Sequence, residues 1–87
     1  KNVIDAVSSF FDINTKDIIG KSRKEELVYP RQITMYIMRK ELNTSYPTIG
    51  NELGGRDHTT AMHAYNKIIK VLDSDEKTKQ DIDSIRQ

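Results

Sequence analysis

Apolar residues recur every three or four positions in several segments of the chain, and short polar segments separate them. This spacing is typical of amphipathic helices that pack one face on a core. The first such segment is residues 3–11, and a shorter one, residues 15–19, ends at Gly20. Because cap-forming side chains lie between the two segments, the pattern predicts two separate helices.

A polar segment, residues 21–25, comes next, and we expect it to form an exposed basic loop. The pattern then predicts a helix to about Leu42, with Pro30 in its first turn, where the missing N–H is not needed. Its expected apolar side consists of Ile33, Met35, Tyr36, Ile37, Met38 and Leu42.

The segment from Ser45 to Gly55 predicts a short helix that ends in a glycine turn. Ser45 is suited to cap this helix, and Pro47 fits its first turn. Asp57 is placed to cap a longer helix that follows almost at once. In that helix Met62, Tyr65, Ile69 and Leu72 are predicted to face the core, and Thr59, Thr60, His63, Lys67 and Lys70 to face outward.

The last segment, residues 78–87, predicts a closing helix with Ile82 and Ile85 facing inward. No segment alternates as a strand does, and no internal repeat is found. The fold class predicted for residues 1–87 is therefore all-α: one compact bundle of about six helices, with a helix-turn-helix and a basic loop.

A short helix, a glycine turn and a longer helix form a helix-turn-helix, whose second helix enters the DNA major groove with its N-terminal residues. Residues 56–60 lie at that end. The Asp57 carboxylate could accept from a base amino group, a threonine methyl could meet a thymine methyl, and His58 could donate or accept. The simpler interpretations stay open: Asp57 as a helix cap alone, and His58, Thr59 and Thr60 as ordinary first-turn residues.

The charges are unevenly distributed along the chain. The net charge is only +1, but residues 21–70 contain nine basic and five acidic residues, a balance of +4, and both ends are net acidic. Such a distribution would attract a polyanion to one face. In the basic loop, an arginine could enter a minor groove, although a solvated loop is the simpler interpretation. Arg31, Gln32, Arg39 and Lys40 could hold phosphates, or the basic ones among them could form surface ion pairs with Glu26 or Glu41.

Composition excludes several other classes. The chain has no cysteine, which excludes disulfides and thiolate metal sites, and no apolar run approaches the roughly 20 residues of a membrane span. His58 and His63 are about 140° apart around a helix, so they are unsuited to chelate one metal together. No serine or threonine has a recognisable base partner, so no enzymatic role is expected.

Because the chain begins at Lys1, we expect it to be part of a longer protein.

The segments "GGRDHTTAMHAYNKI", "SRKEELVYPRQITMYIMRKEL" and "SYPTIG" resemble, in order and spacing, the DNA-binding domain of the bacterial replication initiator DnaA. The resemblance covers nearly the whole chain. It implies binding of short A·T-rich duplex elements, the DnaA boxes, at the replication origin. Two departures are noted: relatives often have lysine in place of Arg39, and some have a basic residue in place of Glu25.

The resemblance also implies a role for each site residue. Base reading falls to five residues: Asp57, His58, Thr59 and Pro47 in the major groove, and Arg23 in the minor groove. Phosphate contacts fall to Arg31, Gln32, Arg39, Arg56, Thr60 and His63, with Lys21 and Lys24 as further candidates. No cofactor or metal is expected in this chain, because the initiator's ATP site needs a phosphate loop that the sequence lacks.

The resemblance implies a cytoplasmic, nucleoid-associated protein. Double-stranded DNA is the expected partner, regulatory proteins could bind the same surface, and no membrane contact is expected. This domain is expected to be a monomer, whereas the full-length initiator would oligomerise on the origin. Two alternatives stay open: a protein-docking module, which would need an exposed apolar patch, and an RNA-binding domain, which would need an aromatic stacking platform.

Overall fold

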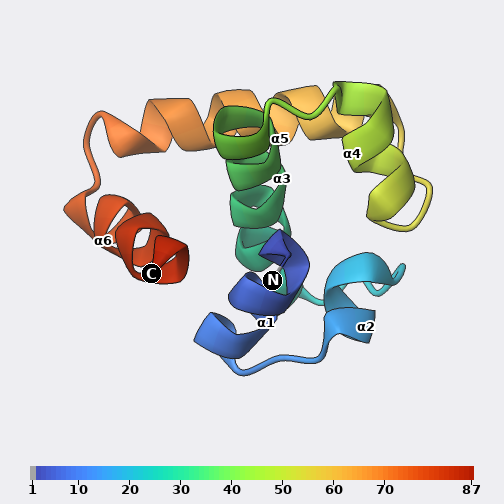
Figure 1. The fold of residues 1–87 in the computed structure, drawn as a ribbon, viewed down its shortest axis with the longest axis horizontal. Coiled ribbons are helices and arrows are strands. Elements are labelled where there is room, and N and C mark those ends of the chain that lie inside the picture. Colours follow the sequence, from blue (N-terminus) through green and yellow to red (C-terminus); the bar gives the residue numbers. More distant parts are fainter. Residues whose placement is uncertain (1) are drawn as a thin grey trace.

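The computed structural model describes residues 2–87, and across these residues the chain is all-α (Figure 1). Within this range the chain forms six α-helices and one short 3-10 helix and no strand, so the predicted fold class is confirmed. The elements are α1 (Val3–Phe11), α2 (Thr15–Ile19), η1 (Glu25–Leu27), α3 (Val28–Leu42), α4 (Tyr46–Glu52), α5 (His58–Leu72) and α6 (Glu76–Arg86).

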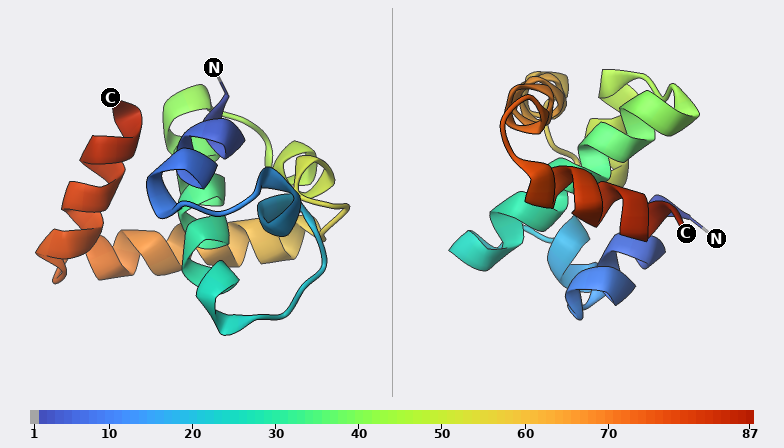
Figure 2. Two further views of the ribbon diagram at one scale, coloured as in Figure 1. Left: turned by 90° about the horizontal axis from the view of Figure 1, so that it is seen from below. Right: turned by 90° about the vertical axis from the view of Figure 1, so that its left-hand side faces the viewer.

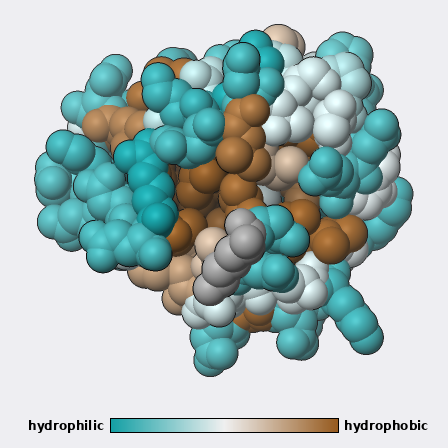
Figure 3. Space-filling view, viewed as in Figure 1, coloured by the Kyte–Doolittle hydropathy of each residue, from teal (hydrophilic) through white to brown (hydrophobic). Residues whose placement is uncertain are grey.

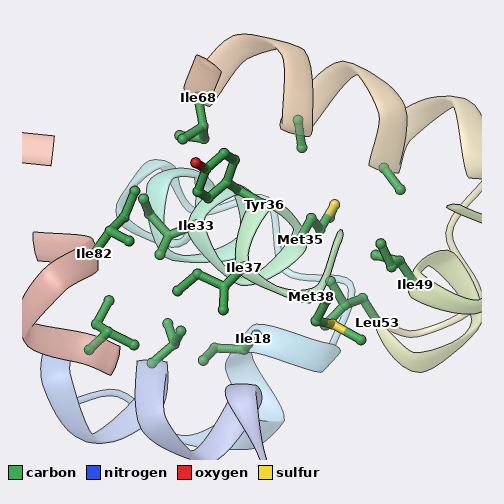
Figure 4. Close-up of a cluster of buried hydrophobic side chains, with 14 residues drawn as sticks. Ile18, Ile33, Met35, Tyr36, Ile37, Met38, Ile49, Leu53, Ile68 and Ile82 are labelled. Atoms are coloured by element: carbon green, nitrogen blue, oxygen red, sulfur yellow. The ribbon is translucent and has the colours of Figure 1, made fainter. Parts of the chain in front are cut away.

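Helix α3 is the centre of the bundle. Apolar side chains from the other α-helices converge on it, as the close-up in Figure 4 shows. Ile33 on α3 is fully buried, and so are Ile18 of α2, Ile49 of α4 and Leu53 after it. The only polar group fully buried on α3, the Thr34 hydroxyl, donates to the Pro30 carbonyl at 2.8 Å, which satisfies it without a partner from another helix.

The other helices are arranged around α3 in two groups. Helix α5 crosses α3 and makes its most extensive contacts with α3 and α4. Helices α4 and α5 and the turn between them form the helix-turn-helix part of the fold. Helix α1 packs on α3, and α6 packs on both α1 and α5. Helix α2 lies near the turn between α4 and α5, as the left view of Figure 2 shows, and Arg56 in that turn donates to the Ile19 carbonyl at 3.1 Å.

Short polar side chains cap four of the six α-helices, whereas Asn14, in the segment predicted to cap α2, makes no such bond. Asn2 accepts from the Asp5 amide at 2.9 Å, and Asp75 accepts from the Lys77 amide at 3.1 Å. The Asp75 cap starts α6 at Glu76, two residues before the predicted start. Asp12 and Asn43 end α1 and α3 in the left-handed conformation, which short polar side chains tolerate better than most.

Two predicted core residues are exposed. Leu42, the last residue of α3, is 60 % exposed, and Ile69 of α5 is 40 % exposed. The buried positions of α5 are instead Ala61, Ala64 and Ile68, spaced three and four apart. The small side chains let α5 lie close to α3, and this turns the buried stripe by about 100°, one residue, away from Ile69.

Apolar side chains also reach the surface where α1, α3 and α6 meet, and Figure 3 shows them surrounded by hydrophilic residues. A shallow cleft there is lined by residues that include Val3, Ala6, Ile37 and Ile85. Among the helices of residues 2–87, none combines the length and apolar character that crossing a membrane would require.

Candidate nucleic-acid interface

The turn between α4 and α5 has the geometry of a helix-turn-helix. Ser45 accepts from the Thr48 amide at 3.3 Å and caps α4. After α4, Gly54 and Gly55 have φ angles of 81° and 75°, as the sequence predicts for a tight turn. Gly50 allows the turn to fold back on α4, because a Cβ there would lie 2.1 Å from the Arg56 carbonyl oxygen.

The N-terminal end of α5 is capped and faces outward. Asp57 Oδ1 accepts from the Thr59 amide at 3.1 Å, so its predicted role as a cap is confirmed. His58 Nδ1 lies 3.0 Å from the same oxygen, and the two side chains are 62 % (His58) and 67 % (Asp57) exposed. Thr60 and His63 are exposed as well, and Thr59 is half-buried. These polar groups are therefore accessible to a partner that approaches the front of α5.

The start of α4 adds a second exposed element. Pro47 is exposed on the first turn of this helix. Arg39 of α3 holds the start of α4 in place: its Nη1 donates to the Thr44 carbonyl at 3.2 Å, and its guanidinium carbon lies 4.4 Å from the centre of the Tyr46 ring. Arg39 thus remains half-buried and keeps its charge near the exposed Pro47.

The basic loop connects α2 to η1 and comprises residues 20–24, rather than the predicted 21–25, because Glu25 begins η1. The side chains of Lys21, Arg23 and Lys24 are exposed, in agreement with the predicted loop. The Lys24 amide donates to the Ser22 hydroxyl at 3.3 Å, a local turn within the loop. In both Figure 1 and Figure 2 the loop lies on the same side of the molecule as the N-terminal end of α5.

Two arginines expected at phosphates donate hydrogen bonds to the main chain. Arg31 is only 8 % exposed and donates four hydrogen bonds to main-chain carbonyls. Arg56 is half-buried and donates three. Burial lowers the pKa of Arg31, the charge of Arg56 lowers it further, and Asp17 opposes this shift. The guanidinium of Arg31 is therefore occupied inside the fold, and its expected contact with a phosphate stays a prediction.

A groove between α3 and α5 brings several of the phosphate candidates together. Gln32 of α3 and Thr60 and His63 of α5 line it, Arg31 and Arg56 also border it, and its apolar floor includes Met35 and Ala64. Gln32 is half-buried, whereas the two α5 residues are exposed at the rim. The groove is thus shallow, polar at its edges and open to solvent beside the front of α5.

The relation to known proteins follows from two comparisons. A family model described as "Bacterial dnaA protein helix-turn-helix" matches residues 1–68. The chain belongs to this family. Proteins named chromosomal replication initiator protein DnaA match nearly the whole chain: that of Levilactobacillus brevis is 50% identical over 94% of it, and that of Lactococcus lactis subsp. cremoris is 44% identical over 100%. The DnaA of Herpetosiphon aurantiacus is 48% identical over 93%.

The chain spans less than a fifth of the length of these DnaA proteins, 18%, 19% and 17% of them respectively. The family match is to the helix-turn-helix part, so this chain is a non-catalytic domain. Among residues 2–87, no three His, Cys, Asp or Glu side chains gather closely enough to hold a metal ion.

Sequence reasoning missed two features of this DnaA helix-turn-helix domain. Gly50, in the middle of α4, gave only the signal of a glycine where a helix former is expected. The internal bonding of Arg31 and Arg56 gave no signal, because an arginine that bonds a phosphate and one that bonds a carbonyl look alike in sequence.

Proposed function

We propose that this domain binds double-stranded DNA sequence-specifically at DnaA boxes of a replication origin and so supports the initiation of chromosomal replication. The observation that carries the proposal is the capped, outward-facing end of α5, with His58 and Asp57 exposed. The basic loop, which contains the exposed Arg23, lies on the same side of the molecule in the left view of Figure 2. Membership in the DnaA helix-turn-helix family supports it.

In this proposal the front of α5 enters the major groove. Asp57, His58 and Thr59 read base edges there, and Pro47 of α4 contacts a base beside them. Asp57 uses Oδ1 for the helix cap, which leaves Oδ2 to accept from a base amino group. Arg23 enters the adjacent minor groove, where a narrow A·T-rich segment concentrates negative potential.

Phosphate contacts then fix the register without reading sequence. Lys21, Lys24 and Arg39 supply charge, and Gln32, Thr60 and His63 supply hydrogen bonds from the groove between α3 and α5. Regulatory proteins that meet the same surface would compete with DNA.

Fluorescence anisotropy with a DnaA-box duplex and a scrambled duplex of the same composition tests the proposal. Titrations at several salt concentrations separate charge from base reading. We expect His58→Ala and Thr59→Ala each to lose about 1–3 kcal/mol on the box duplex and much less on the scrambled one. His63→Ala, on the same helix, is the matched control and should weaken both duplexes alike.

Two outcomes would contradict the proposal. Equal affinity of the unaltered domain for both duplexes would refute sequence-specific binding. Equal losses for His58→Ala and His63→Ala on both duplexes would refute the assignment of base reading to the front of α5.

A further inference from the structure

The end of α2 and the first part of the basic loop are surrounded by two arginine side chains. Arg31 of α3 donates to the carbonyls of Ile18 (3.1 Å) and Ser22 (2.6 Å), and to those of Asp17 (2.6 Å) and Gly20 (3.2 Å). Arg56 of the helix-turn-helix turn donates to the carbonyls of Ile19 (3.1 Å) and Gly20 (2.6 Å), and also to that of Leu53. Five carbonyls of residues 17–22 thus bond two guanidinium groups, an arrangement that we call the arginine clamp.

The clamp satisfies groups that would otherwise lack partners. The last carbonyls of a helix have no intrahelical donor, and α2 has only five residues. A guanidinium presents its N–H groups in a planar fork and can bond several carbonyls at once, which a lysine ammonium on a flexible stem does less well. In the described residues 2–87, no carboxylate lies within ion-pair distance of either arginine. The carbonyls are therefore their main partners.

The clamp joins three parts of the fold that are far apart in sequence. Arg56 is 36 residues from Gly20 and 37 from Ile19. The same turn touches α2 through Gly54, where a Cβ would lie 2.2 Å from the Ile19 carbonyl oxygen. The position of α2 relative to the turn before α5 is thus fixed by direct main-chain approach as well as by Arg56.

The last carbonyl in the clamp belongs to Ser22, the residue before Arg23. Arg23 itself is exposed, and so is Lys24 after it. The clamp therefore anchors the main chain immediately before Arg23 and leaves its side chain free.

We propose that Arg31 and Arg56 are positioning residues that hold the basic loop at a fixed place relative to the front of α5, so that Arg23 and His58 meet one duplex together. The loop-holding part of this inference concerns the free domain, and the DNA part rests on the proposed function.

The free domain provides the first test. Amide hydrogen exchange and 15N relaxation of residues 20–24 are measured for the unaltered domain, Arg56→Lys and Arg31→Lys. We expect faster exchange and larger fast motions in the loop of both variants, with α5 amides unchanged. Arg86→Lys is the matched control, because Arg86 pairs with Glu41 on the opposite part of the bundle and should leave the loop unchanged.

If the loop amides of both variants stay as protected and as rigid as in the unaltered domain, the proposal that Arg31 and Arg56 hold the loop is wrong. Arg56→Lys is the primary variant, because Arg56 is half-buried and less disruptive to replace than the buried Arg31. Thermal unfolding confirms that each variant is folded. If Arg31→Lys fails to fold, Arg56→Lys alone decides the result.

A double-mutant cycle with Arg23→Ala tests the DNA part. If Arg56 acts through the loop, Arg56→Lys should reduce the affinity for the box duplex by a large share of the reduction that Arg23→Ala causes. In a protein that already has Arg23→Ala, adding Arg56→Lys should reduce the affinity hardly at all. The dependence of affinity on salt should stay unchanged between Arg56→Lys and the unaltered domain. Because lysine keeps the positive charge, Arg56→Gln is measured as well to test the effect of removing it. We expect its loss of affinity, too, to be smaller in the Arg23→Ala background than in the unaltered domain.

Losses that simply add, with a smaller salt dependence for Arg56→Gln, would show a direct phosphate contact and overturn the positioning role. If the unaltered domain does not distinguish the box from the scrambled duplex, the proposed function fails. The exchange and relaxation measurements then still decide whether the clamp holds the loop.

Discussion

Substitution of Gly54 by alanine tests how tightly the helix-turn-helix is packed on α2. Gly54 has a φ of 81°, and an added Cβ would lie 2.2 Å from the Ile19 carbonyl oxygen and 3.2 Å from Arg56 Nη1. The nearest atom belongs to the main chain, so no side-chain rotation relieves the contact. The turn and α2 would have to move apart.

Gly55 is the matched control, because its φ is 75° and a Cβ there would meet nothing within 4 Å. Gly55→Ala therefore carries only the penalty of a positive φ, of order 1–2 kcal/mol. Gly54→Ala carries the same penalty and an overpacking term of typically about 1–3 kcal/mol. We expect Gly54→Ala to lower the free energy of unfolding by about 1–3 kcal/mol more than Gly55→Ala.

Urea unfolding followed by circular dichroism measures the difference. The midpoint should fall further for Gly54→Ala, while the slope m stays the same for both variants if the fold is retained. In a domain of this size each lost kcal/mol corresponds to roughly 4–8 °C in Tm, so thermal unfolding gives an independent value. Equal losses for the two variants would refute the close approach of Gly54 to α2.

Three further predictions concern stability. Asp57→Ala should lower the unfolding free energy by about 1 kcal/mol through loss of the α5 cap, and Asp57→Asn should keep most of it; equal losses in thermal unfolding would contradict the cap. Ile68→Ala should lower the free energy of unfolding, measured in urea, by about 2–5 kcal/mol, and Ile69→Ala should lower it by far less. The reverse order would show that Ile69, and not Ile68, belongs to the core. Burial raises the pKa of Tyr29 to about 12. Because Tyr29 ionises at lower pH in the unfolded chain, stability should fall between about pH 10 and 12. Tyr29→Phe should reduce this loss, and Tyr36, whose pKa burial also raises, accounts for part of the rest. A pH profile that Tyr29→Phe leaves unchanged would contradict the half-buried Tyr29 hydroxyl.

The sequence predicted the helix boundaries well because local chemistry sets them. Ser45, Asp57 and the glycine pair act within a few residues of their own position, so their roles follow from sequence alone. The exposed loop with Arg23 was predicted for the same reason, because it contains no apolar residue that would pack into the core.

The choice of core stripe on α5 could not be predicted in the same way. Both Ile68 and Ile69 satisfy a helical period, and the fold buries Ile68 together with Ala61 and Ala64. Alanine is too small to mark a core stripe clearly in a hydrophobic pattern. Tertiary packing thus determined a choice that periodicity left open.

The roles of the arginines illustrate the same limit for the candidate site. Counted by charge, Arg31 and Arg56 belong to the basic middle of the chain with Arg23 and Lys24. Their partners are carbonyls 9 to 14 residues away for Arg31, and up to 37 away for Arg56, which only the folded chain brings together. A count of basic residues therefore overestimates how many cations are free to meet DNA.

This division of the arginines also explains how a domain with a net charge of only +1 could serve as a specific reader. Phosphate attraction strengthens binding to all sequences, whereas specificity depends on holding the reading groups in register. A cation used inside the fold to fix the basic loop beside the front of α5 adds little general attraction. If the arginine clamp acts as proposed, the basic loop and the front of α5 form one rigid surface, and a duplex that fits only one of them binds weakly.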